Sequence, residues 1–178
     1  MRQYRRGFTL VEMLVVILIL GIMMGMTIPR IAMVRQLARE AAMKMNLHSV
    51  QVVVEEFHAE QGYYADDFYE DGYGALFPGG ILNDQMGRLP TNPWTGHQMD
   101  PDEFNPEDYE YETDVSNTNE GGPNDQYGFT MGEIVYGIWQ PEGAEWPTQY
   151  GLVGIGRAGI AMRSLDEDDN AVVFVLHN

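Results

Sequence analysis

Residues 7–29 of the chain are GFTLVEMLVVILILGIMMGMTIP. From Met13 to Pro29 this segment has no charged side chain, and Leu, Ile, Val and Met predominate. A helix needs about 20 apolar residues to cross the hydrocarbon core of a bilayer, and residues 8–29 provide that length. We therefore predict a transmembrane helix over residues 8–29.

The residues around this segment leave two interpretations open. A secretory signal peptide also has a basic start, here MRQYRRG at residues 1–7, followed by an apolar run. Against a signal peptide, the run is long, no A-x-A-like cleavage site follows it, and Glu12 lies inside it. A carboxylate at membrane depth costs on the order of 3 kcal/mol and usually has a partner. In one interpretation, Glu12 lies near the membrane interface or is protonated. In the other, a cut after Gly7 frees the amine of Phe8, and this amine pairs with the Glu12 carboxylate of the same or a neighbouring subunit.

The motif GFTLVE at residues 7–12, followed by an apolar helix with Gly21 and Pro29, resembles the N-terminus of type IV pilins and of the pseudopilins of type II secretion systems. In that family a prepilin peptidase cuts after the glycine and methylates the new N-terminal Phe. The resemblance therefore implies cleavage between Gly7 and Phe8 and N-methylation of Phe8.

The resemblance also implies how subunits assemble. It assigns Glu12 to guiding assembly, and it matches Gly21 and Pro29 to positions where family helices loosen or kink, as both residues weaken helices. The implied partners are further copies in a helical filament, the prepilin peptidase, and an inner-membrane assembly platform with its secretion ATPase complex. The implied location is the bacterial inner membrane, crossed once, with the head periplasmic or extracellular. Basic residues flank both ends of the span, so the positive-inside rule does not set this orientation.

The helical pattern continues over residues 30–61. Apolar residues recur at three- and four-residue steps and predict a stripe that packs on a core, namely Ile31, Val34, Leu37, Ala41, Met45, Val50, Val54 and Phe57. Gly62 follows as a C-terminal stop. One helix over residues 8–61 would be about 80 Å long at 1.5 Å per residue. The segment also carries four basic residues that either form a solvated, interface-anchoring face or pair with acidic heads of neighbouring subunits: Arg30, Arg35, Arg39 and Lys44.

Charge divides the chain into two physically different parts. The 178 residues carry 10 basic and 27 acidic side chains, a net charge of −17. Residues 1–50 hold seven basic and two acidic side chains, whereas residues 51–178 hold three basic and 25 acidic ones. A part this acidic excludes nucleic acid as a partner, because neutralising phosphates requires clustered Lys and Arg. The absence of Cys excludes disulfides, thiolate zinc sites, Fe–S clusters and cysteine nucleophiles.

Residues 62–178 are predicted to form an acidic β head. The segment GRLPTNPWTG at residues 87–96 predicts a rigid turn that packs Trp94. This turn is similar to the Leu-Pro…Asp-Pro-Trp-Gly signature of major pseudopilins, with Asn92 in place of Asp and one extra residue before the glycine. Residues 100–126 are acidic and turn-rich, and predict a surface loop insertion.

Short apolar runs in the head predict strands over residues 129–131, 134–139, 151–155 and 171–176, with a tight hairpin at residues 131–134. The predicted fold class is α+β, in which a long N-terminal helix packs on a small antiparallel sheet.

Two motifs in the head lack the context that their chemistry requires. Residues 154–159 match G-x-G-x-x-G, but no helix and second parallel strand can follow within the remaining chain, which excludes a dinucleotide site. Residues 166–170 match the first three ligand positions of an EF-hand, but Ala171 and His177 stand where Gly and Glu are required.

Candidate metal and catalytic residues are few. Major pseudopilins commonly bind calcium in a late loop of the head, so the resemblance makes Asp166, Asp168, Asn124 and Asp125 candidate calcium ligands. A solvated acidic turn is the favoured alternative. The four His residues are scattered along the sequence, and G-x-S-x-G and P-loop patterns are absent, so we predict that the chain is not an enzyme.

These features predict a membrane-anchored filament subunit. The turn at residues 87–96 and the lack of a disulfide-bounded C-terminal loop favour a pseudopilin of a type II secretion system. A true type IV pilin for adhesion, motility or DNA uptake is the nearest alternative. A monomeric, membrane-anchored module whose acidic head captures cations or a basic partner is a rival from another class.

Overall fold

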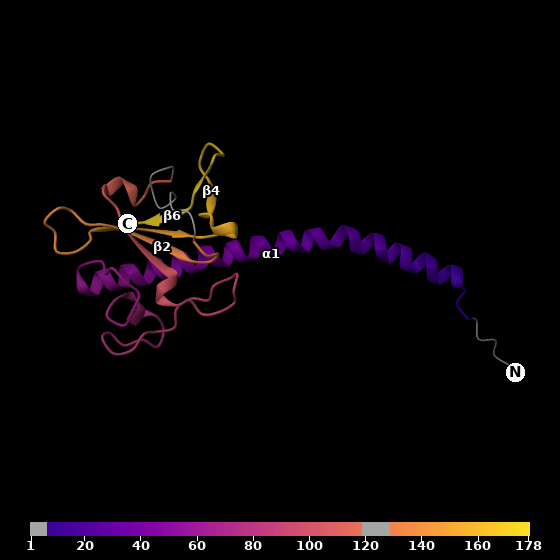
Figure 1. Ribbon diagram of the computed structural model, residues 1–178, viewed down its shortest axis with the longest axis horizontal. Coiled ribbons are helices and arrows are strands. Elements are labelled where there is room, and N and C mark those ends of the chain that lie inside the picture. The colour runs from indigo at the N-terminus through magenta and orange to yellow at the C-terminus, as the bar shows by residue number, and fades with distance from the viewer. Residues whose placement is uncertain (1–6, 119–128) are drawn as a thin grey trace. The chain divides into compact units, whose positions relative to one another are not determined.

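The computed structural model describes residues 7–118 and 129–178, and it comprises two compact units, Met1–Ala38 and Arg39–Asn178. Helix α1 (Leu10–Gln61) is 52 residues long and belongs to both units (Figure 1). It ends where the sequence predicted, because Gly62 adopts a φ of 84° and its N–H donates to the His58 carbonyl at 2.8 Å. Glycine tolerates this left-handed conformation at a helix C-terminus without the steric cost of a Cβ.

The second unit contains a four-stranded sheet with the order β1-β2-β3-β6, and a separate pair, β4-β5 (Figure 1). The β2–β3 and β3–β6 pairs are antiparallel, whereas β1 pairs in parallel with β2. The strands are β1 (Phe104–Asp108), β2 (Ile134–Trp139), β3 (Gln149–Gly154), β4 (Arg163–Leu165), β5 (Ala171–Val173) and β6 (Val175–His177). Short 3-10 helices occur at Tyr73–Leu76, Pro101–Glu103, Glu112–Asp114 and Arg157–Gly159. A long N-terminal helix with a small, mainly antiparallel sheet confirms the predicted α+β class.

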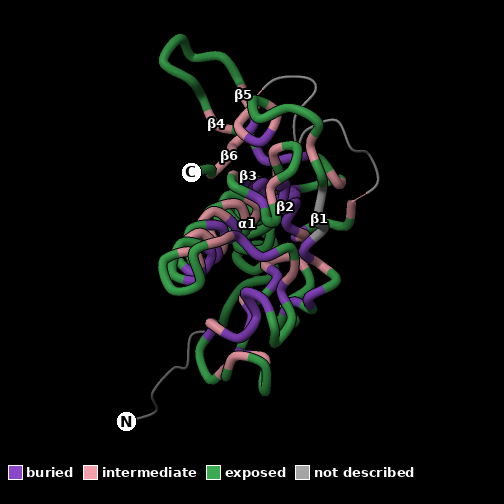
Figure 2. Tube along the Cα trace, turned by 90° about the vertical axis from the view of Figure 1, so that its left-hand side faces the viewer, coloured by how far each residue is buried: buried purple, intermediate pink, exposed green. Residues whose placement is uncertain are grey.

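The core of the second unit lies between α1 and one face of the sheet, and alternate residues of β2 and β3 belong to it. Figure 2 shows buried segments of β2 and β3 beside α1. The main cluster includes Met43, Leu47, Val50, Val54 and Phe57 from α1, and Ile134, Tyr136, Ile138, Tyr150 and Leu152 from the strands. The intervening strand residues form a second cluster with the β4–β5 region: Val135, Val153, Ile155, Ala161 and Val173. The sheet is therefore buried on both faces.

The predicted helix stripe is only half right. Val50, Val54 and Phe57 are buried as expected, but Met45 is 71% exposed, and Ile31, Val34 and Leu37 are also exposed. Five of the six buried positions in the described part of α1 alternate steps of four and three residues: Met43, Leu47, Val50, Val54 and Phe57. Val53, beside Val54, is the sixth. Met45 is two residues from Met43 and from Leu47, and a two-residue step turns an α-helix by about 200°. Ala41 and Met45 therefore belong to the opposite, solvent face.

Three strand predictions need correction. Residues 129–131 are not a strand, and no tight hairpin joins residues 131–134. Instead, Gly132 turns with a φ of 91°, and its N–H donates to the Ile155 carbonyl at 2.8 Å. The predicted run at residues 171–176 splits into β5 and β6 because the Phe174 N–H donates to the Met162 carbonyl at 2.8 Å.

The predicted loop insertion at residues 100–126 is also wrong in part. It contains β1, which begins at the buried Phe104 and pairs with β2 over five residues. The sequence of β1, FNPED, has low strand propensity, so its conformation follows from backbone pairing with β2 and not from local preference. The end of the insertion, residues 119–126, lies outside the described residues.

Candidate functional site

The segment where cleavage is predicted lies directly before α1. Gly7, Phe8 and Thr9 are not helical and are exposed, and Phe8 is 74% exposed. A protease binds its substrate as an accessible, non-helical strand of chain. The Gly7–Phe8 bond therefore has the local structure that processing requires.

Thr9 and Glu12 form a capping box at the start of α1. The Thr9 N–H and the Thr9 hydroxyl both donate to the Glu12 carboxylate at 2.8 Å, and the Glu12 N–H donates to Thr9 Oγ1 at 3.2 Å. The box satisfies N–H groups that have no partner within the helix. We did not predict this cap, although Thr-x-x-Glu before an apolar run is its sequence signature. In the uncleaved chain, Thr9 is thus a hydrogen-bond partner of the Glu12 carboxylate. The pairing of Glu12 with the Phe8 amine that cleavage would free stays a prediction.

Gly21 and Pro29 lie inside α1, which continues through both positions. Pro29 has no N–H, so the carbonyl of Gly25, four residues earlier, lacks its helical donor. At Gly21 and Gly25 a Cβ would meet no atom within 4 Å, so both glycines leave open space beside the helix. Their predicted role as points where the helix loosens stays a prediction.

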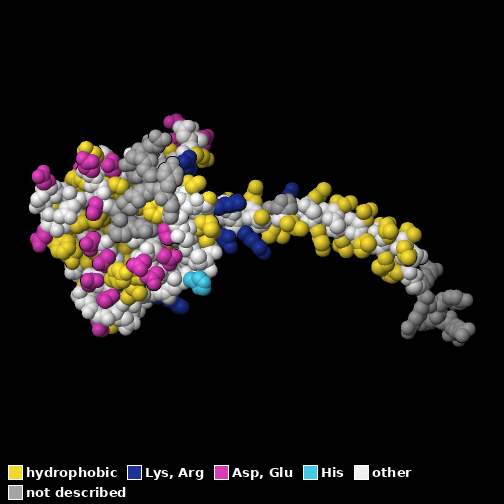
Figure 3. All heavy atoms as spheres, in the orientation of Figure 1, with side chains coloured by type: hydrophobic (Ala, Val, Ile, Leu, Met, Phe, Trp, Pro, Cys, Tyr) yellow, Lys and Arg dark blue, Asp and Glu magenta, His cyan; other side chains and the backbone are white. Residues whose placement is uncertain are grey.

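Within the described part of the chain, α1 is long and apolar enough to cross a membrane, judged by length and composition. The large apolar side chains from Leu10 to Ile28 are exposed, so this stretch is not covered by residues 7–118 or 129–178 (Figure 3). Its exposure distinguishes it from the core helix of a soluble protein, which is mostly buried.

Comparison with known proteins identifies the same region. A family model described as the prokaryotic N-terminal methylation motif matches residues 2–28. The N-terminal region of this chain is type IV pilin-like. The type IV major pilin protein PilA of Myxococcus xanthus (strain DK1622) is 31% identical over 68 residues, which cover 38% of this chain and 31% of that protein. The match thus spans about a third of the pilin's length, and no solved structure matches the chain significantly.

The basic residues of the pilin-like helix differ in their surroundings. Lys44 lies with its Nζ 4.7 Å from the centre of the Phe174 ring, a cation–π contact within the second unit. The His48 ring meets the same Phe174 ring edge-on. Lys44 is therefore engaged by its own head, and the predicted pairing with neighbouring subunits stays open for Arg30, Arg35 and Arg39.

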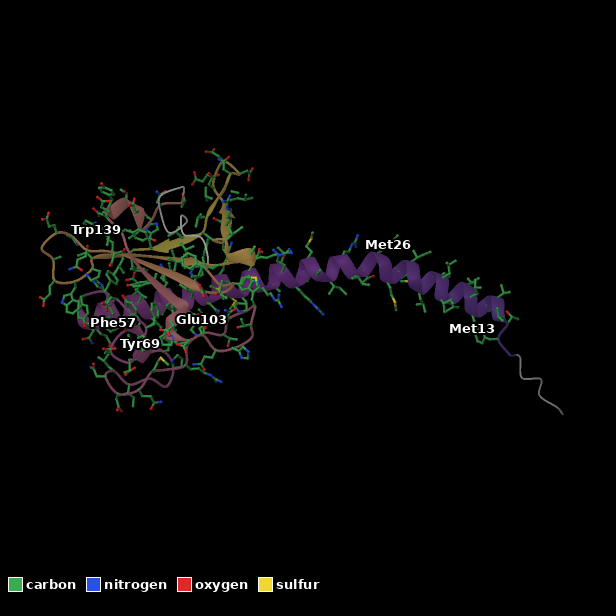
Figure 4. All side chains as sticks on the ribbon, viewed as in Figure 1. Met13, Met26, Phe57, Tyr69, Glu103 and Trp139 are labelled. Carbon is green, nitrogen blue, oxygen red and sulfur yellow. The ribbon has the colours of Figure 1, made fainter. Side chains whose placement is uncertain are left out.

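The predicted Trp turn is organised around Asn92, which is completely buried, whereas Trp94 is only half-buried. The Asn92 side-chain amide donates to the Met131 carbonyl at 3.0 Å and to Glu103 Oε1 at 3.2 Å (Figure 4 labels Glu103). Its carbonyl oxygen Oδ1 accepts from the backbone N–H groups of Trp94, at 2.9 Å, and Thr95, at 3.3 Å. The side-chain NH2 group of Asn92 donates to two oxygen acceptors, which an ionised carboxylate cannot do. Asn92 therefore suits this position better than the Asp of the pseudopilin signature would.

The candidate calcium residues are only partly described. Asp166 Oδ1 accepts from the N–H groups of Asp168, at 2.9 Å, and Asn170, at 2.8 Å, as in an Asx turn. The Asn170 backbone bond is the main reason that the pKa of Asp166 is lowered. Asn124 and Asp125 lie outside the described residues, so their position relative to this turn is not given by the structure. The calcium site stays a prediction.

The other candidate motifs do not converge. Residues 154–159 run from the end of β3 into a single 3-10 turn, Arg157–Gly159, as the Gly-rich turn interpretation predicted. His58 stacks on Tyr64, whereas His48 contacts Phe174, so these two His side chains have different partners. Among residues 7–118 and 129–178, no group of three His, Asp or Glu side chains is arranged to hold a metal ion.

Proposed function

We propose that the chain is a structural subunit of a type IV pilus-like filament, assembled through α1 after cleavage between Gly7 and Phe8. The observation that carries this proposal is the methylation motif at residues 2–28, which overlies the capped start of α1, where the large apolar side chains are exposed. An apolar segment of this length cannot remain in water, so lipid must cover it before assembly and other subunits after assembly. The proposed partners are a prepilin peptidase, an inner-membrane assembly platform with its ATPase, and further copies of the chain.

The proposed location rests on the same helix, and its orientation rests on the resemblance to pilins and pseudopilins. Before assembly, the chain crosses the bacterial inner membrane once, and the acidic second unit lies in the periplasm or outside the cell. The cleaved leader, residues 1–7, remains on the cytoplasmic side, where its three Arg residues meet an anionic membrane surface.

Within the filament class we favour a pseudopilin of a type II secretion system. The similarity of the turn at residues 87–96 to the pseudopilin signature supports this choice, as does the absence of a Cys pair. A true type IV pilin is the second candidate, supported by the match to the M. xanthus major pilin. Deletion of the gene distinguishes them: loss of protein secretion supports the pseudopilin, and loss of surface pili with normal secretion supports the pilin.

The Glu12→Val variant tests the filament proposal. Removing the carboxylate removes the group that is expected to set the stagger between neighbouring helices, while the second unit is unchanged. We expect Glu12→Val to abolish filaments, seen by electron microscopy of sheared material, and to leave the protein in the membrane. Glu12→Asp, which retains the charge, serves as the matched control and should assemble partially. Normal filaments from Glu12→Val would contradict the proposed assembly mechanism.

A further inference from the structure

The loop between β2 and β3, residues 140–148, holds a Trp side chain partly in solvent. Trp146 is 44% exposed. Its ring stacks on that of Tyr63, which follows the end of α1, with the ring centroids 4.4 Å apart and the ring planes at 25°. Tyr63 in turn meets the buried Phe57 ring edge-on, at 5.5 Å between centroids. The pair is therefore anchored to the core, while part of the indole stays open to a partner, as is typical of Trp and Tyr at protein interfaces.

Hydrogen bonds within the loop hold Trp146 in place. The Thr148 N–H donates to the Trp139 carbonyl at 3.0 Å and closes the loop at the end of the sheet. Inside the loop, the Ala144 N–H donates to the Pro141 carbonyl, also at 3.0 Å. An aromatic side chain that is already ordered loses less conformational entropy when a partner binds to it. The loop thus presents Trp146 in a form suited to recognition.

The charge of the segments that form this surface is negative. Glu142 and Glu145 lie in the loop itself, Glu60 lies in the last turn of α1, and all three are exposed. No Lys or Arg occurs in residues 45–87 or 89–156, which contain the loop and the end of α1. On the face that Figure 3 shows, Asp and Glu side chains lie at the left-hand end of the second unit, where α1 ends in Figure 1. The complementary partner of such a surface is a cation.

We propose that the Trp146–Tyr63 pair and the carboxylates of the β2–β3 loop bind an Arg side chain in a basic segment of another protein. A planar guanidinium stacks on the face of an indole and donates its N–H groups to a carboxylate at the same time. Glu145, the neighbour of Trp146 in the loop, is the proposed acceptor. Both interactions favour the same group, so a basic segment fits this surface better than an apolar or acidic one. The inference goes beyond the filament proposal, because it assigns the second unit a partner of its own.

Peptide binding tests the proposal on the full-length protein, solubilised in an uncharged detergent. The probe is a dye-labelled peptide of alternating Gly and Arg, and the reference is the same peptide with citrulline, which has the shape of Arg without its charge. We expect the Arg peptide to bind, and the citrulline peptide to bind at least about tenfold more weakly, as measured by fluorescence anisotropy. Equal binding of the two peptides, or no binding of the Arg peptide, would overturn the proposal. The measurement does not require filaments, so its result is independent of the proposed function.

Two substitutions of Trp146 test the role of its ring. Trp146→Leu keeps an apolar side chain but removes the aromatic face, so the Arg peptide should bind about five- to tenfold more weakly. Trp146→Tyr retains an aromatic ring and should recover most of the affinity. Both variants should keep the melting temperature of the wild type, because Trp146 lies outside the core clusters. Wild-type affinity in Trp146→Leu would contradict a contact with the indole.

A matched pair of charge substitutions separates this surface from the general acidity of the head. Glu145 and Glu167 are both exposed, and Glu167 lies in the turn between β4 and β5, outside the β2–β3 loop. We expect Glu145→Gln to weaken binding of the Arg peptide about threefold or more and Glu167→Gln to leave it unchanged. Equal weakening by both would show nonspecific attraction and would overturn the proposal. Displacement of the peptide by a neutral oligosaccharide would identify a sugar as the occupant and would contradict a basic segment.

Discussion

Asn92 shows how one residue can hold several segments of the head together. Its amide connects the turn at residues 87–96 to Glu103 and to the Met131 carbonyl, which are 11 and 39 residues away in sequence. Glycine is required at the neighbouring position 132, because a Cβ there would collide with the Asn92 side chain. The sequence showed that Asn92 departs from the usual Asp of the signature, but not why. The reason lies in partners that only the folded chain brings together.

Asn92→Asp should destabilise the head by about 1–3 kcal/mol at neutral pH. The new carboxylate cannot donate to the Met131 carbonyl and would face the Glu103 carboxylate in a buried site. Protonating the new Asp relieves the repulsion, so the loss should shrink as the pH falls toward 4. Chemical denaturation of the purified protein at both pH values measures the effect.

Gln98→Glu is the control for this prediction. Gln98 is exposed and close in sequence, and its substitution adds the same charge. We expect a change within about 0.5 kcal/mol, as for most surface substitutions. Equal stabilities of the two variants would rule out the proposed role of Asn92.

At the scale of elements, local signals predicted α1 well and the strands less well. The end of α1 at Gly62 was predictable because one glycine with a left-handed conformation determines it. The face of α1 that packs on the sheet was not, because apolar residues occur on both faces between Ala41 and Ala59. Similarly, Ala171–Leu176 is a single apolar run, and its break at Phe174 depends on a hydrogen bond to Met162 in another segment.

The two faces of α1 should respond differently to truncation. Leu47 is fully buried in the core, so Leu47→Ala should lower the free energy of unfolding by about 2–5 kcal/mol. Met45→Ala removes a side chain of similar size from the solvent face and should change it by less than about 0.5 kcal/mol. Thermal or chemical denaturation followed by circular dichroism measures both. A larger effect at Met45 than at Leu47 would contradict the packing face that the structure assigns.

At the scale of the whole molecule, buried tyrosines should make the head sensitive to alkaline pH. The Tyr136 hydroxyl donates to the Ala65 carbonyl at 3.0 Å and lies 2.6 Å from the Tyr73 hydroxyl, and Tyr150 donates to Glu55 at 2.6 Å. Burial raises the pKa of Tyr73, Tyr136 and Tyr150 above their ordinary value of about 10. Each of these bonds needs a protonated hydroxyl.

The sign of this pH dependence follows from proton binding. Above pH about 10 the unfolded chain releases tyrosine protons that the folded chain retains, so stability is complete below that pH and falls above it. Each such tyrosine should contribute a slope of about 1.4 kcal/mol per pH unit. Denaturation curves at a series of pH values from about 9 to about 12 measure the slope, and Tyr136→Phe should reduce it. A profile that stays flat up to pH about 12 would rule out the burial of these hydroxyls.

Charge is the main physical obstacle to assembly of the proposed filament. Cleavage after Gly7 removes Arg2, Arg5 and Arg6, which takes the side-chain charge from −17 to −20. Copies of such a chain repel one another unless salt, bound cations or the basic residues of α1 offset the repulsion.

The most direct test of the central claim is the identity of the first residue in the assembled protein. Filaments sheared from cells should contain a subunit that begins with N-methylated Phe8, so intact-mass spectrometry should give the mass of residues 8–178 plus one methyl group. A membrane protein that keeps residues 1–7, or one cut elsewhere and never found in filaments, would contradict the account.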